Sequence, residues 1–178
     1  MIYITGDTHG DVTRFSMDNF PEQKTFTDQN KNYVIICGDF GLIWNYLTET
    51  HSEKYWLNWL EAKKFTTLFV DGNHEAFNRL YDYPVKEWNG GLVHEIRPHV
   101  LHLIRGQVFN IDGCTIFTFG GARSHDIKNL LDLDDPDFTE KQKQLRKDNL
   151  FYRVKGISWW EEEMPTQEEM QIGLDNLE

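Results

Sequence analysis

Three short stretches of the sequence place side chains that bind metal ions directly after apolar runs. Asp7 and His9 lie in GDTHG, Asp39 lies in GDF, and Asn73 and His74 lie in GNHE. Carboxylate, imidazole and amide oxygen together suit a borderline divalent ion such as Mn²⁺, Fe²⁺, Zn²⁺, Co²⁺ or Ni²⁺, whereas Mg²⁺ and Ca²⁺ prefer oxygen atoms alone. The residue types therefore predict a divalent metal centre, provided that the three stretches meet in the folded chain.

The spacing within these stretches indicates a role for each side chain. Asp7 and His9 are two residues apart, so one loop can bring both to a single ion. Asp39 has two carboxylate oxygens and could bridge two ions, and Asn73 could hold the second ion through its carbonyl. The competing interpretation is ordinary turn chemistry, because Gly-Asp and Gly-Asn are common turn pairs. Three clusters, each following an apolar run, favour the metal centre.

The elements around these clusters predict how they come together. Residues 1–7, 33–39 and 66–74 begin as β-branched or aromatic apolar runs, which are typical of buried parallel strands. Between the second and third runs, Thr50 and Glu53 have the spacing of a helix capping box. An alternation of strands and helices predicts an α/β protein with a parallel sheet. The carboxyl ends of parallel strands lie at one edge of the sheet, where ligands usually bind.

The second half of the chain has a different character. Residues 106–124 predict a β-hairpin that turns at Asp112-Gly113. The polar residues 126–149 predict a surface excursion. Thr166 and Glu169 repeat the capping-box spacing, which predicts a helix within residues 166–178.

Length and charge narrow the possible functions. The 178 residues suit one domain, and the net charge of −11 disfavours a general nucleic-acid or anionic-membrane binder, which needs a basic face. No apolar stretch is long enough to span a membrane, so we expect a cytoplasmic protein. Cys37 and Cys114 lie in apolar runs and are expected to be buried free thiols.

The three motifs, in this order and about thirty residues apart, resemble the calcineurin-like metallophosphoesterase superfamily. Later stretches such as RGQVFNIDG, TFGGARS and GISWWEEE are similar to a bacterial and phage-type branch of it. The resemblance implies a layered α-β-β-α sandwich of two mixed sheets. It also implies two divalent metal ions, with Mn²⁺ first among the candidates. The implied activity is hydrolysis of a phosphate ester by a metal-bound hydroxide at a dinuclear centre.

The resemblance also assigns site roles. Asp7 and His9 would bind the first metal, Asp39 would bridge, and Asn73 would bind the second metal. His74 would be a catalytic residue beside the substrate phosphate, orienting it or protonating the leaving oxygen. Glu75 would support the loop.

The sequence departs from the superfamily pattern in two respects. Members usually supply two further histidine ligands downstream, one of them in Gly-His-x-His, and this chain has no histidine after His125. We therefore expect residues 1–178 to be the N-terminal part of one metallophosphoesterase domain. The arginines of the protein-phosphatase branch are also missing around GDF and GNHE, which disfavours that activity. The alternatives are a catalytically silent binding module and a truncated, inactive enzyme.

Other polar and aromatic residues are expected to play structural or surface roles. We do not predict metal ligation by His94, His99 and His102, and we place His51 and His125 at the surface. For Trp159 and Trp160 we expect hydrophobic packing. We expect three arginines to form ion pairs rather than phosphate contacts: Arg79, Arg123 and Arg153.

Overall fold

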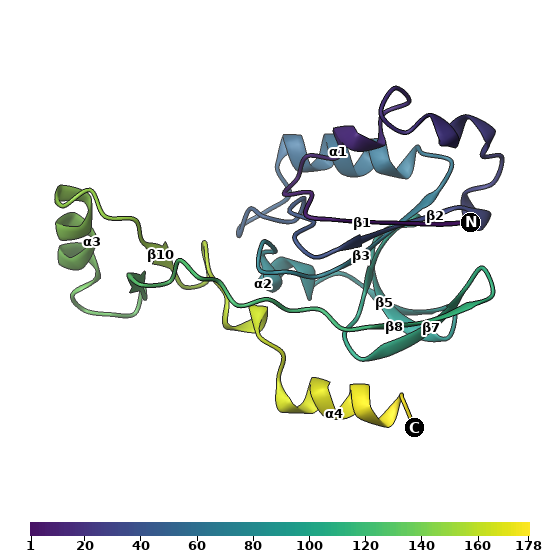
Figure 1. Cartoon of the computed structure of the whole chain (residues 1–178). Helices are drawn as coiled ribbons and strands as arrows, with labels where there is room; N and C mark the ends of the chain where they lie inside the picture. Colours follow the sequence, from purple (N-terminus) through teal and green to yellow (C-terminus); the bar gives the residue numbers. More distant parts are fainter.

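The computed structural model describes residues 1–178 and contains a central mixed sheet of six strands (Figure 1). The strands run in the order β1-β2-β3-β6-β5-β4. Neighbours among the first four are parallel, while β5 and β4 are added in antiparallel fashion. The bounds are β1 Ile2–Gly6, β2 Tyr33–Cys37, β3 Thr66–Val70, β4 Val85–Trp88, β5 Gly91–Arg97 and β6 Val100–Leu103. The predicted α/β class and the three predicted parallel strands are confirmed.

Four α-helices and two small sheets complete the fold. The strands β7 and β8 form an antiparallel hairpin around Asp112-Gly113, as predicted. The bounds are α1 His51–Glu61, α2 Phe77–Leu80, α3 Phe138–Lys147, α4 Gln167–Asp175, β7 Gln107–Ile111, β8 Cys114–Thr118, β9 Leu130–Leu131 and β10 Arg153–Val154. The longest helix has 11 residues, and none is both long and apolar enough to cross a membrane.

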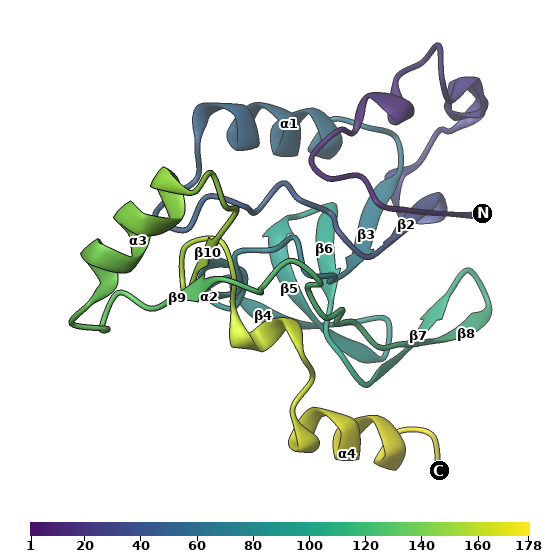
Figure 2. The same cartoon turned by 60° about the vertical axis from the view of Figure 1, so that its left-hand side comes forward.

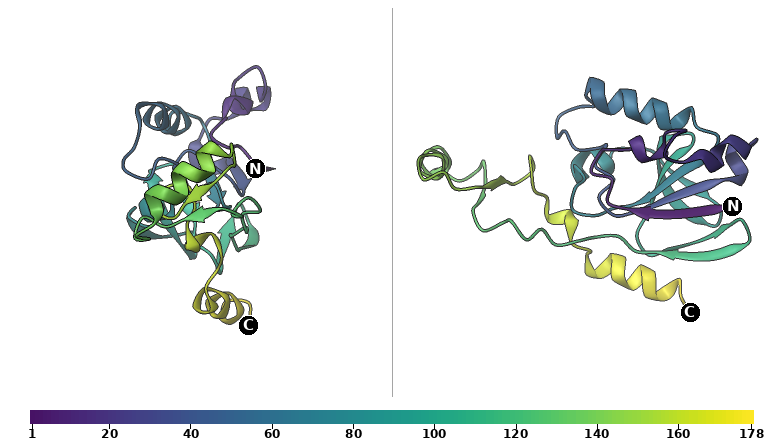
Figure 3. Two further views of the ribbon diagram at one scale, coloured as in Figure 1. Left: turned by 90° about the vertical axis from the view of Figure 1, so that its left-hand side faces the viewer. Right: turned by 45° about the horizontal axis from the view of Figure 1, so that its top comes forward.

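The layers follow an α-β-β-α order. Helix α1 covers one face of the large sheet, and the β7–β8 hairpin lies against the other face, with α4 outside the hairpin (Figures 1 and 3). The contact between α4 and the hairpin is close, because a Cβ on Gly173 would meet the rings of Phe117 and Phe119 at 3.1–3.3 Å. The second β layer is a two-stranded antiparallel sheet.

Helix α1 forms where the capping box predicts it. The Thr50 hydroxyl accepts a hydrogen bond from the backbone of Glu53, and the Glu53 carboxylate accepts one from the backbone of Thr50. Leu57 and Leu60 are fully buried against the sheet, and burial of each stabilises the fold by about 1.5–3 kcal/mol. Tyr55 lies on the opposite side of the helix and is 60% exposed.

The chain between Ser124 and Trp160 extends beyond the end of the central sheet and carries α3, β9 and β10 (Figures 1 and 2). Helix α3 buries none of its residues, so the predicted surface excursion is confirmed. The prediction of buried thiols was wrong. Cys37 and Cys114 are both free and exposed, because Cys37 is the last residue of β2 and Cys114 is the first residue after a hairpin turn.

Candidate metal centre

The strands β1, β2 and β3 end side by side. Gly6 at the end of β1 pairs with Cys37 at the end of β2, which in turn pairs with Val70 at the end of β3. Because the strands are parallel, the polar segments that follow them start at the same edge of the sheet. The three motifs therefore lie next to one another, as the sequence predicts.

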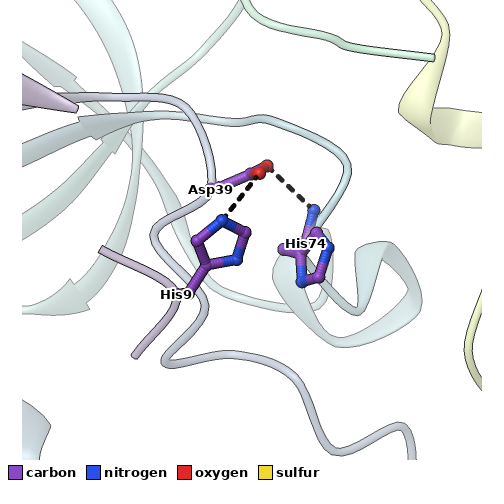
Figure 4. Close-up of side chains that lie close together, drawn as sticks. All are labelled: His9, Asp39 and His74. Carbon is purple, nitrogen blue, oxygen red and sulfur yellow. Dashed lines mark hydrogen bonds and ion pairs between the residues drawn. The ribbon is translucent and has the colours of Figure 1, made fainter. Parts of the chain in front are cut away.

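Three side chains from these segments form a compact cluster (Figure 4). One possible ligand atom from each of His9, Asp39 and His74 lies within 4.8 Å of the others. His9 Nε2 lies 3.5 Å from Asp39 Oδ2, and the rings of His9 and His74 meet edge to face with centroids 4.4 Å apart. Two donors that each bind one ion at about 2.1 Å are themselves roughly 3.4 Å apart in a tetrahedral site. The His9–Asp39 pair therefore fits a shared divalent ion.

Backbone hydrogen bonds hold the Asp39 carboxylate in place. Its Oδ1 accepts from the backbone N–H of Asn73 at 2.9 Å and of His74 at 3.2 Å. The opposite oxygen, Oδ2, faces His9. The loop after β3 thus fixes the side chain that follows β2, and this leaves Oδ2 directed at the cluster.

The backbone of the site is strained at the predicted ligands. Asp7, His9 and Asp39 have φ values of 47°, 45° and 45°, in the left-handed region that residues with a Cβ rarely adopt. Each such conformation costs on the order of 1 kcal/mol or more, and such strain gathers at functional sites. Three of the six non-glycine residues with positive φ thus lie at this edge of the sheet, which agrees with a functional role for it.

Gly72 is required for the close approach of the two loops. A Cβ at Gly72 would overlap the Asp39 carboxylate and lie 2.5 Å from the Asp39 backbone nitrogen. Real Cβ atoms do not make such contacts, so any larger residue would displace Asp39.

Glu75 connects the loop after β2 to the loop after β3, in the supporting role expected for it. Its side chain is fully buried and accepts hydrogen bonds from the backbone N–H of Phe40 at 2.7 Å and of Gly72 at 3.3 Å. Burial, reinforced by the negative charge of Asp71, raises the pKa of Glu75 to about 8. A neutral carboxyl group therefore fastens the loops in the metal-free protein at neutral pH.

Asp7 lies outside this cluster, whereas Asn73 lies beside it, because its backbone N–H donates to the Asp39 carboxylate. Asp7 is exposed, and its side chain is not among the clustered ligand atoms. Together with Asp39 it lines a neighbouring groove of about 540 Å³. Arg14 donates hydrogen bonds to the carbonyl oxygens of Gly6 and Asp7, which fixes the backbone there. Asn73 is half-buried, and its Nδ2 donates to Ser124 Oγ at 3.3 Å.

His74 is ordered by an aromatic neighbour. Its ring stacks on Trp44 with centroids 5.0 Å apart and an interplanar angle of 18°. Trp44 in turn meets the buried Trp160 edge to face, so the packing expected for Trp160 is present. Burial lowers the pKa of His74, although the Asp39 carboxylate opposes the shift.

A pocket of about 450 Å³ opens beside His9 and Trp44. Trp44, Tyr46 and Trp56 form its aromatic walls, and no Lys or Arg lines it. The pocket therefore offers mainly apolar and neutral polar contacts next to the cluster, and Glu53 is its one carboxylate.

The remaining candidates have structural partners or lie at the surface. His102 Nε2 lies 3.0 Å from Asp71 Oδ1, and its Nδ1 lies 2.9 Å from Nδ1 of His94. His99 bonds to Glu61, and Arg79 and Arg153 form ion pairs with Glu53 and Asp126. His51 and His125 are exposed.

Sequence reasoning missed the parts played by Ser124, Glu163 and Trp44. Trp44 lies only four residues beyond GDF, within the same loop, but Ser124 and Glu163 are 51 and 90 residues from Asn73. No local pattern in the sequence relates them to the site, and only the folded structure brings Ser124 to Asn73.

Comparisons with known proteins agree with this geometry. The chain is 27% identical over 138 residues to the lariat debranching enzyme of Drosophila melanogaster, a match that covers 70% of this chain and 24% of that protein. No solved structure matches the chain significantly. The family of calcineurin-like phosphoesterases matches residues 1–174. With the motifs at one sheet edge and the layered α/β fold, this match shows that the chain belongs to the calcineurin-like phosphoesterase family.

Proposed function

We propose that the chain is a phosphoesterase that uses two divalent metal ions, preferentially Mn²⁺, to hydrolyse phosphate esters. Membership of the family implies metal-dependent phosphoester hydrolysis in general. The observation that carries the finer proposal is the cluster of His9, Asp39 and His74, which lies at the carboxyl edge of the parallel strands. Its donor types fit borderline divalent ions.

Each predicted ligand has a place in this proposal. Asp7 and His9 would hold the first ion, Asp39 would be shared by the two ions, and Asn73 would hold the second through its side-chain carbonyl. When bound, such ions lower the pKa of a coordinated water and offset the charge of the phosphate. The chain itself contributes fixed positions, because backbone N–H groups and Gly72 hold the Asp39 carboxylate.

In this proposal His74 acts on the substrate rather than as a ligand. Its ring plane is set by stacking on Trp44, and its edge faces His9. A side chain so placed can donate a hydrogen bond to a phosphate oxygen or pass a proton to the leaving oxygen. Its proximity to Asp39 also makes metal ligation by His74 a geometric alternative, which the His74→Gln variant below addresses.

The pocket beside His9 would receive the organic part of the ester. Its aromatic walls favour apolar or planar groups, and the lack of Lys and Arg disfavours additional phosphates. We therefore propose a small ester with an uncharged organic group. Lariat debranching, the activity in the name of the Drosophila relative, is disfavoured because nucleic acids require a basic surface and this chain carries −11.

Hydrolysis of para-nitrophenyl phosphate and bis(para-nitrophenyl) phosphate tests the proposal. Metal-stripped protein should show no turnover, and Mn²⁺ should restore it. Asp39→Asn should abolish activity, and His74→Gln should lower kcat by about 10²–10⁴ with Mn²⁺ binding retained, if the residue acts as an acid or positions the phosphate.

His51→Gln is the matched control, because His51 is exposed at the start of α1 and belongs neither to the cluster nor to the pocket lining. Its activity should equal that of the wild type. Protein that binds Mn²⁺ but turns over neither ester would favour the two alternatives, a silent binding module or an inactive, truncated form. Loss of Mn²⁺ binding in His74→Gln would instead make His74 a ligand.

A further inference from the structure

A buried carboxylate far along the chain reaches the loop that contacts Asn73. Glu163, in the 3₁₀ turn Glu161–Glu163, is only 1% exposed. Its Oε1 accepts a hydrogen bond from the Ser124 backbone N–H at 2.8 Å, and its Oε2 accepts one from the Ser124 hydroxyl at 2.6 Å. Ser124 is itself 5% exposed. The pair is thus shielded from water and connected by two hydrogen bonds.

The backbone around this pair keeps it in register. The Ala122 N–H donates to the carbonyl oxygen of Glu163 at 3.1 Å. Arg105 donates from its guanidinium to the carbonyl oxygen of Glu162 at 2.7 Å. The loop of Ser124 and the turn of Glu163 are therefore held together by contacts that do not involve the Glu163 carboxylate.

The polarity of the hydrogen bonds determines which end of the Asn73 amide faces Ser124. A carboxylate only accepts, so the single hydroxyl proton of Ser124 is donated to Glu163. The Ser124 oxygen can then only accept from its other neighbour, and that neighbour is Asn73 Nδ2 at 3.3 Å. The NH₂ end of the amide is thereby fixed toward Ser124. The carbonyl end, Oδ1, has no hydrogen-bond partner within the chain and is not buried from solvent.

We propose that Glu163 and Ser124 are positioning residues that orient the carbonyl oxygen of Asn73 for a divalent cation. This inference rests on the proposed function, in which Asn73 holds the second ion. An amide binds a cation through its oxygen and not through its NH₂ group, so orientation decides whether Asn73 is a ligand. Partners of this kind typically change metal affinity 10–100-fold when they are removed.

The Glu163→Gln substitution tests the proposal by reversing the direction of the hydrogen bonds that the Ser124 hydroxyl makes. The introduced amide would accept from the Ser124 N–H with its one oxygen, so its NH₂ group would face the Ser124 hydroxyl and donate to it. The Ser124 proton would then point at Asn73 and select its carbonyl oxygen, which turns the NH₂ group of Asn73 toward the cation. Ser124→Ala removes the selection without reversing it, and Ser124→Thr keeps the hydroxyl.

The measurement is calorimetric titration of metal-stripped protein with Mn²⁺, with the thermal midpoint of each metal-free variant as a check on folding. We expect Glu163→Gln to weaken binding of one ion about 10–100-fold, Ser124→Ala to weaken it less, and Ser124→Thr to bind like the wild type. Glu161→Gln is the matched control: it lies in the same turn, but its side chain is 68% exposed and pairs with Lys155. Its affinity should not change.

Wild-type Mn²⁺ affinity in both Glu163→Gln and Ser124→Ala would overturn the positioning role. Titration of Asp39→Asn in the same series distinguishes this outcome from failure of the proposed function. If Asp39→Asn loses Mn²⁺ while the Glu163 and Ser124 variants keep it, the metal centre stands and the positioning role is wrong. If Asp39→Asn also binds like the wild type, the metal centre itself is wrong. Should Glu163→Gln fail to fold, Ser124→Ala and its rescue by Ser124→Thr decide the question.

Discussion

Two buried glutamates hold the loops around the site in place. Glu53 does so as an ionised carboxylate, and Glu75 does so as a neutral carboxyl group. Glu53 accepts hydrogen bonds from the backbone N–H groups of Trp44, Asn45 and Thr50 and pairs with Arg79 at 3.1 Å. Burial alone would raise its pKa, but the three N–H groups and then Arg79 outweigh burial, so the pKa of Glu53 is lowered. Glu75 has no cation beside it, and its pKa rises to about 8.

The difference between Glu53 and Glu75 separates the loop that supports the pocket from the loop that carries the candidate metal ligands. The loop of residues 40–50, which carries the aromatic pocket wall, is held by a neutralised ion pair that does not depend on a metal. The loop of residues 71–75 carries the candidate ligands and is held by a group that avoids adding negative charge beside Asp39 and Asp71. Arg105 pairs with Asp71 at 2.6 Å, and a neutral Glu75 adds no further negative charge beside Asp39 before a cation binds.

The same substitution at both glutamates should separate these roles most strongly. Glu53→Gln leaves Arg79 buried and without its carboxylate and turns an NH₂ group toward the Thr50 N–H, so it should lower the free energy of unfolding by about 3–5 kcal/mol. Glu75→Gln replaces a group that is already neutral and weakens one 3.3 Å bond, so it should cost only about 1 kcal/mol.

Urea unfolding of the metal-free proteins at pH 7 measures both effects. Lys31→Ala, which removes an exposed ion pair with Asp28, is the control for surface charge and should leave stability unchanged. Equal losses at Glu53 and Glu75 would contradict the distinction between them.

Gly72→Ala should distort the loop that carries the candidate ligands without unfolding the molecule. The added Cβ would overlap the Asp39 carboxylate, so Mn²⁺ affinity should fall about tenfold or more through displaced ligands. Gly113→Ala is the comparison variant, since a Cβ at Gly113 in the β7–β8 turn meets nothing within 4 Å. Its Mn²⁺ affinity should match that of the wild type, although its positive φ of 80° will cost some stability. Wild-type affinity in Gly72→Ala would show that the two loops can separate freely.

The pH dependence of stability should reveal the Glu53 carboxylate. Because its folded pKa lies below the ordinary value of 4.5, its contribution is fully present above pH 4.5 and is lost as the pH falls through the folded pKa. The stability difference between the wild type and Glu53→Gln should therefore be constant from pH 7 to about pH 5 and shrink below it, by on the order of 1 kcal/mol for each unit of pKa shift. A difference that grew in acid would reverse the assigned sign.

Local patterns in the sequence predict much of the fold. Apolar runs that stop at glycine predict the positions of β1, β2 and β3, and Thr50-Glu53 and Thr166-Glu169 mark the starts of α1 and α4 through bonds that both capping boxes make. The exposure of Cys37 and Cys114 could not be predicted from the apolar runs in which they lie. Exposure at a strand end depends on what packs over it, and that is a property of the whole fold.

The candidate site is predictable in its location but not in its supports. Parallel pairing alone brings the GDTHG, GDF and GNHE stretches to one edge. The side-chain direction of Asp7 and the fixing of Asn73 by Ser124 depend on rotamers and on residues far away in the sequence. The identity and number of the ions likewise lie outside what ligand types specify.

The most direct test of the account is the number of Mn²⁺ ions bound per chain after dialysis, in the wild type and in Asp39→Asn. We predict two ions in the wild type and fewer in the variant, because Asp39 lies between the proposed ion positions. Equal binding by both proteins, or no binding by the wild type, would contradict a dinuclear centre at His9, Asp39 and Asn73.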